Sequence, residues 1–92
     1  MAVELPVTFI EERDSVIAYT PALDLSTSAS TRQEAHAMFQ EIVQIFFNDL
    51  MESNTADEVL TGLGWRKDIM NASWIPPRIS QESIGVQIPM FA

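Results

Sequence analysis

The chain has 92 residues and a formal net charge of −8 at pH 7, with 47% hydrophobic and 20% charged residues. This length allows one domain with a small core, the composition excludes a disordered chain, and no apolar run reaches the ~18 residues of a membrane span. Cysteine is absent, which excludes disulfides and thiolate chemistry, and the first residues lack the pattern of a signal peptide, so we expect a cytoplasmic protein.

Residues 1–29 predict a three-stranded antiparallel meander. Apolar and polar residues alternate over residues 3–9, which is the period of a half-buried strand. A polar turn then leads to a β-branched and aromatic run at residues 16–19, and alternation resumes from Leu23. The short spacing between these runs favours strands that pair with their neighbours in the chain.

Residues 30–54 predict one long amphipathic helix. Thr31 and Glu34 have the spacing of a capping box, in which side chains satisfy free amides at a helix start. The apolar positions recur at helical steps, namely Ala35, Phe39, Ile42, Phe46 and Leu50, widened by Met38, Val43, Ile45 and Phe47. This arc spans roughly 200°, whereas packing on one sheet face needs ~100° or a little more.

The surplus apolar surface of this helix needs a second cover. Two alternatives remain open, namely the C-terminal segment of the same chain and a second copy in a dimer or higher oligomer. The candidate contact residues are Ile45, Phe47 and Met51.

Residues 55–64 predict a short helix. Thr55 and Glu58 repeat the capping-box spacing, and Gly64 stands where a left-handed residue ends a helix. We expect residues 65–92 to form an extended tail, because the pair Pro76 and Pro77 forbids a helix.

The end of this tail predicts a fourth strand. Apolar residues alternate again over residues 84–90, and Pro89 lies among them. Proline lacks an amide donor and therefore places such a strand at a sheet edge. We expect the tail to dock on its own body or on a neighbour. The whole chain is thus predicted to form a single two-layer α+β domain of the order β-β-β-α-short α-β, with the long helix on one face of an antiparallel sheet.

Negative charge is concentrated in the first part of the chain. Residues 1–60 hold eleven acidic and two basic side chains, a net charge of −9, whereas residues 61–92 hold two acidic and three basic, a net charge of +1. Such a surface repels phosphate backbones and attracts basic proteins, so we expect a basic protein partner and no direct nucleic-acid binding. The alternative is that the charge serves solubility alone. The candidate partner-contact residues are Glu11, Glu12, Asp14 and Asp24.

Motifs for catalysis, metals and cofactors are absent from the sequence. The carboxylates of the first hairpin and third strand are candidates for a metal nuclease only if they gather on one side, and a solvated turn is the simpler interpretation. His36 has no nucleophile elbow beside it and is expected to be a half-buried packing residue. Trp65 and Trp74 favour packing in the core or tail over base stacking. We therefore expect no enzyme and no cofactor.

Several short motifs, taken in order, resemble the HicB-like antitoxin family. The pattern "P-x-L" and then "T-x-x-E-A" is kept by Pro21, Leu23, Thr31, Glu34 and Ala35. The later "L-x-x-L-G-W" matches residues 60–65, and "W-I-P-P" matches residues 74–77. The resemblance covers roughly residues 7–79.

The resemblance implies a partially degraded RNase-H-like fold, a dimer, and neutralisation of a small basic HicA-type ribonuclease toxin by protein–protein binding. The chain departs from the family where Ser28-Ala29-Ser30 replaces the usual glycine. Nothing after residue 79 resembles a helix-turn-helix or ribbon-helix-helix, so DNA binding is not carried over. An orphan dimeric regulatory or structural protein without a toxin is the alternative.

Overall fold

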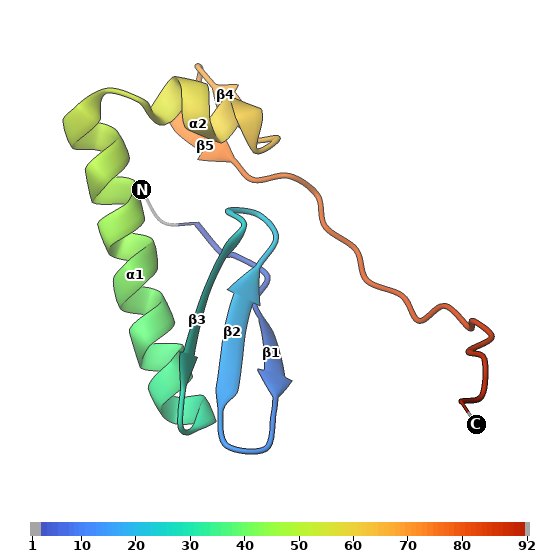
Figure 1. Ribbon diagram of the computed structural model, residues 1–92. Helices are drawn as coiled ribbons and strands as arrows, with labels where there is room; N and C mark the ends of the chain where they lie inside the picture. The colour runs from blue at the N-terminus through green and yellow to red at the C-terminus, as the bar shows by residue number, and fades with distance from the viewer. Residues whose placement is uncertain (1–2, 92) are drawn as a thin grey trace.

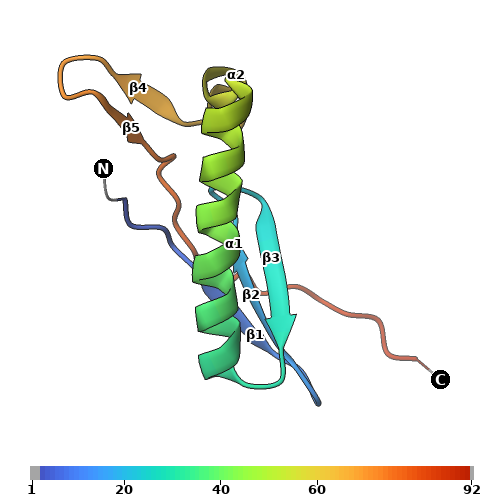
Figure 2. The same cartoon turned by 90° about the vertical axis from the view of Figure 1, so that its left-hand side faces the viewer.

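The computed structural model describes residues 3–91 and shows an α+β fold. Its elements in chain order are β1 (Thr8–Glu11), β2 (Val16–Thr20), β3 (Leu25–Ala29), α1 (Arg32–Ser53), α2 (Ala56–Gly62), β4 (Arg66–Asp68) and β5 (Ser73–Ile75). An antiparallel sheet has the order β1-β2-β3, and β4 and β5 form a second, two-stranded sheet. The long helix α1 runs across one face of the first sheet (Figures 1 and 2). The predicted fold class is therefore confirmed.

In the first sheet, the side chains of every second residue along a strand face α1. Ala18 of β2 lies opposite Phe9 of β1 and Thr27 of β3. Ala18 is buried in one core cluster, in which Ala35 and Phe39 of α1 take part. The other face of the sheet carries the intervening side chains, and no helix among residues 3–91 covers that face (Figure 2).

A second core cluster lies where α1, α2 and the β2–β3 turn meet. Its buried members are Ala22, Leu23, Leu50, Leu60 and Trp65. The Trp65 side chain is 2% exposed, and its Nε1–H donates a hydrogen bond to the Ala22 carbonyl oxygen at 2.8 Å. The sequence favoured packing for this tryptophan. The indole links segments that are 43 residues apart in the chain.

The start of α1 follows from its cap. Thr31 is the N-cap residue, and its Oγ1 accepts a hydrogen bond from the Glu34 amide at 3.1 Å, which is one of the two hydrogen bonds of the predicted capping box. The second predicted capping box is wrong, because Thr55 makes no side-chain cap bond. Its hydroxyl lies instead 2.8 Å from the Ser53 Oγ.

Replacing Thr31 by alanine is expected to lower the free energy of unfolding by about 1 kcal/mol, because one amide of the first turn loses its partner. Thr55→Ala is the matched control, since the same side chain is removed at a helix start without a cap bond. Urea denaturation of the two variants measures the difference. Equal losses for both variants would contradict the role given to the Thr31 hydroxyl.

The end of α2 also agrees with the sequence. Gly64 has a positive φ of 93°, its amide donates to the Thr61 carbonyl, and the Trp65 amide donates to the Leu60 carbonyl. This pair of bonds is the Schellman motif, which satisfies carbonyls at a helix end and favours glycine at the left-handed position.

Both ends of the predicted strand pattern need correction. The first strand begins at Thr8 and not at residue 3, because Pro6 has no amide to donate to a ladder. The predicted strand over residues 84–90 is wrong, since residues 76–91 have no regular secondary structure. The first part of this tail packs on the body, since Ile79 contacts the second core cluster, whereas residues 82–91 are exposed and leave the body in Figure 1. Alternation alone does not hold a strand that has no ladder partner.

Candidate functional site

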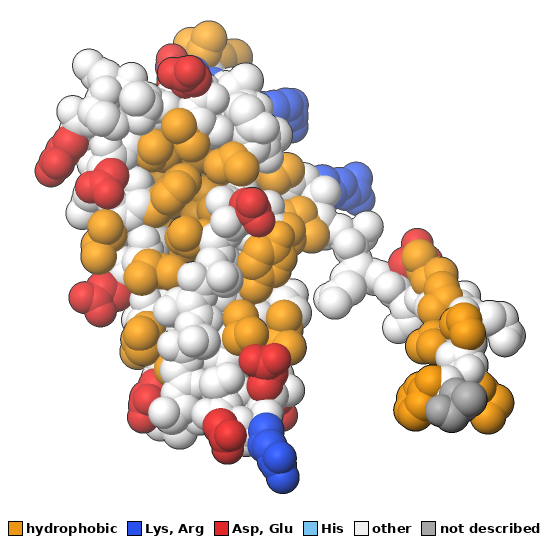
Figure 3. Space-filling model, viewed as in Figure 1, with side chains coloured by type: hydrophobic (Ala, Val, Ile, Leu, Met, Phe, Trp, Pro, Cys, Tyr) orange, Lys and Arg blue, Asp and Glu red, His pale blue; other side chains and the backbone are white. Residues whose placement is uncertain are grey.

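Three of the four predicted partner-contact carboxylates lie together at one end of the molecule. Glu11 ends β1, and Glu12 and Asp14 belong to the turn before β2. All three side chains are exposed. The turn is closed by a 2.8 Å hydrogen bond from the Glu12 amide to the Ser15 carbonyl. Glu11, Glu12 and Asp14 are called the acidic end below, and Figure 3 shows acidic side chains at this end of the molecule.

Asp24 does not join them. It lies in the turn between β2 and β3, which is separated from the acidic end by the length of β2 (Figure 1), about 13 Å at ~3.3 Å per residue. Asp24 has a left-handed φ of 50°, and its Oδ1 accepts a hydrogen bond from the Tyr19 hydroxyl at 3.3 Å. Partial desolvation and the hydrogen bond and charge of Asp24 raise the pKa of Tyr19. Asp24 thus acts as a turn residue.

This separation removes the geometry that a carboxylate-dependent nuclease needs. The condition that the sequence set for a metal nuclease, namely four carboxylates gathered on one side, is not met, and the turn residues Glu11, Glu12 and Asp14 are exposed to solvent. Among residues 3–91, no group of three or more His, Asp or Glu side chains lies close enough to hold a metal ion.

His36 is exposed on α1, and the expectation of a half-buried side chain is wrong. Its ring stacks on the Phe9 ring, with centroids 6.3 Å apart and an angle of 6° between the ring planes. The Arg32 guanidinium carbon lies 4.4 Å from the same Phe9 centroid, which is cation–π geometry. Arg32 and His36 are one helical turn apart, so both side chains contact the ring of edge strand β1.

A groove runs between β1 and α1 beside this stack. Its volume is about 300 Å³. It is lined by Leu5, Val7, Phe9, His36, Phe39 and Gln40. We call it the β1 groove. Its lining is mostly apolar, and it lies at the free edge of the sheet, so it suits apolar side chains from an added strand.

The surplus apolar surface of α1 is covered in part by the same chain. The Phe47 ring meets the Trp65 ring edge to face, at a centroid distance of 5.9 Å. Ile45 and Met51 remain 51% and 57% exposed. Of the three candidate contact residues, Phe47 is therefore covered by its own chain. Ile45 and Met51 are not, and their role as oligomer contacts stays a prediction.

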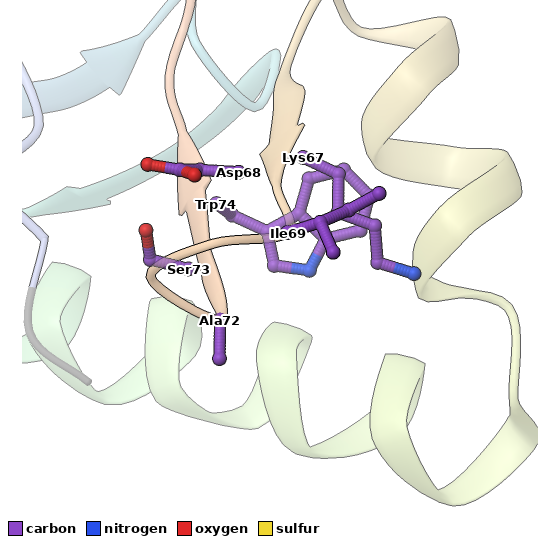
Figure 4. A pocket seen from close by; sticks show the side chains of 6 residues that line it. All are labelled: Lys67, Asp68, Ile69, Ala72, Ser73 and Trp74. Atoms are coloured by element: carbon purple, nitrogen blue, oxygen red, sulfur yellow. The ribbon is translucent and has the colours of Figure 1, made fainter.

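The β4–β5 hairpin forms a further small pocket that the sequence did not indicate. Its volume is about 370 Å³, and it is lined by Lys67, Asp68, Ile69, Ala72, Ser73 and Trp74. Figure 4 shows Lys67 and Ile69 beside the Trp74 ring, with Asp68 and Ser73 pointing another way. The Lys67 ammonium lies 5.5 Å from the Trp74 centroid and pairs with Asp57 at 2.9 Å.

The turn of this hairpin depends on Asp68 and Asn71. Asp68 accepts hydrogen bonds from the Asn71 side chain at 2.7 Å and from the Asn71 amide at 3.3 Å. The side-chain bond, followed by the backbone bond, lowers the pKa of the Asp68 carboxyl. An Asp and an Asn three residues apart are typical turn residues, and this was the available signal for the hairpin. The pocket holds no catalytic constellation and suits an apolar side chain.

No protein-family model, curated protein or solved structure matches this chain. The HicB-like resemblance therefore rests on the short motifs alone. No helix among the described residues is long and apolar enough to cross a membrane.

Proposed function

We propose that this protein is an antitoxin-like inhibitor that binds a small basic HicA-type ribonuclease and neutralises it by covering its surface. The proposed action is binding and not catalysis. The observation that supports it best is the distribution of charge. Residues 1–60, with a net charge of −9, contain the first sheet, all of α1 and most of α2, so the excess negative charge belongs to the helix–sheet body.

The negative charge of the body is available to a partner. Among residues 3–91, one ion pair is present, between Lys67 and Asp57. The acidic end has no ion pair within the described chain, and its side chains are exposed. An exposed charged surface such as the acidic end accelerates encounter with a protein of opposite charge, and this acceleration weakens as the salt concentration rises. The resemblance to HicB-like antitoxins then suggests which class of basic protein is the partner, namely a HicA-type ribonuclease.

The experiment is a titration of the basic ribonuclease with this protein at several salt concentrations. The triple variant Glu11→Gln/Glu12→Gln/Asp14→Asn removes the charge of the acidic end with little change of shape. We expect it to lower the association rate by about 10-fold at low salt and to flatten the salt dependence. Stopped-flow mixing measures the rate, and RNA cleavage measures neutralisation.

The matched control removes the same charge elsewhere on the body. Glu41, Asp49 and Glu52 are exposed on α1, and Glu41→Gln/Asp49→Asn/Glu52→Gln is expected to have a clearly smaller effect. Equal effects would assign the attraction to net charge and not to the acidic end. Absence of binding to any basic protein encoded beside its gene would contradict the inhibitor role and favour the orphan regulatory alternative.

A further inference from the structure

The tail carries apolar side chains that its own body does not cover. Five of them are 74–97% exposed, namely Ile84, Val86, Ile88, Met90 and Phe91. Figure 3 shows hydrophobic side chains gathered at the far end of the tail. The radius of gyration is 16.4 Å, whereas a compact chain of this length has ~12 Å. Apolar side chains that stand away from a body in this way mark an interaction site.

The body has a free edge with a matching groove. β1 is an outer strand of the sheet, and the β1 groove lies between it and α1. An extended segment that adds to such an edge gains ladder hydrogen bonds and places alternate side chains in the groove. The unpaired amides and carbonyls of β1 and of the tail satisfy each other in this arrangement.

The tail fits this edge in length and in pattern. β1 has 4 residues, Thr8–Glu11, about 13 Å at ~3.3 Å per residue, and residues 84–90 extend about 23 Å on the same basis, so the segment is long enough to pair along the whole of β1. Ile84, Val86 and Ile88 share one face of an extended chain, and the intervening positions are Gly85 and Gln87. Pro89 comes near the end of the segment, and an edge strand tolerates it.

Charge and geometry select a second copy of this chain as the source of the strand. After Glu82 the tail has no charged side chain, so a body of strong negative charge does not repel it, and a basic partner gains nothing from it. Ile79, Ser80 and Gln81 line a pocket with Thr8 and Tyr19 of their own sheet. The chain beyond them points away from its own body in both views (Figures 1 and 2).

We infer that residues 84–90 of each chain add as a strand to β1 of a second copy and fill its β1 groove with Ile84, Val86 and Ile88. The inference is independent of the toxin partner, because it concerns contacts between identical chains. It also buries apolar side chains of the tail that remain exposed on their own chain.

Sedimentation equilibrium of the full chain at micromolar concentration tests this inference. The full chain is expected to be a dimer. Ile84→Asp/Ile88→Asp is expected to raise the dissociation constant by at least about 100-fold, because two buried apolar side chains are lost. Its thermal unfolding as a dilute monomer should match that of the unchanged chain, since Ile84 and Ile88 are 74% and 80% exposed on their own chain. Amide exchange should protect residues 84–90 in the dimer and not in the variant.

Two control variants distinguish the tail contact from other causes of dimerisation. Ser83→Asp/Gln87→Asp adds the same charge to the other face of the tail and is expected to leave the dimer intact. Ile45→Asp probes the exposed face of α1. A monomeric full chain, a dimer that depends on Ile45 and not on Ile84 and Ile88, or equal dissociation by both tail variants would each overturn the inference.

Discussion

Trp65→Ala should lower the free energy of unfolding by about 3–5 kcal/mol, the cost of truncating a buried aromatic side chain. The indole is 2% exposed and packs against Phe47. A domain of this size has about 5–15 kcal/mol of stability in total, so this variant loses a large share of it. Guanidinium denaturation followed by circular dichroism measures the change.

Trp65→Phe separates the hydrogen bond from the packing. It keeps an aromatic ring but leaves the Ala22 carbonyl without the Nε1–H donor, at an expected cost of about 1–3 kcal/mol. This variant also keeps the test decisive if Trp65→Ala does not fold. Trp74→Phe is the matched control, because that indole is only half-buried. A loss at Trp74 as large as the loss at Trp65 would contradict the assigned role.

Phe39→Ala is the second large effect, at about 3–5 kcal/mol. Phe39 is buried against Val16, Ala18 and Ala35 between α1 and the first sheet. Phe46 belongs to the same helical stripe but is half-buried, so Phe46→Ala is expected to cost clearly less. Thermal denaturation of the two variants compares them directly. A larger loss for Phe46 would mean that the sheet does not support α1 as described.

The helix and the meander were predictable because their signals are local. The helical stripe and Thr31 determine where α1 begins and which side it buries, and alternation at residues 16–19 marks the central strand. The contact between Trp65 and Ala22 was not predictable, because no local pattern relates residues 43 positions apart. The β4–β5 hairpin was missed because three-residue strands are too short for a visible period.

The candidate site shows a different kind of error. Glu11 and Asp24 are close in sequence, but successive turns of a meander lie at opposite ends of its strands. The predicted three-stranded order already implied this separation. The tail strand failed for another reason, since alternation over residues 84–90 describes what a strand would bury and does not provide the neighbour that it needs.

The helix α1 contributes side chains to both core clusters, and its Val43 packs against each of them. Each cluster has only four or five buried members, too few to persist alone. Melting of this one helix therefore removes the support of the meander and of the α2 region at the same time. The domain is consequently expected to unfold cooperatively, as one unit, with the central amides of α1 exchanging with solvent only when the whole fold opens.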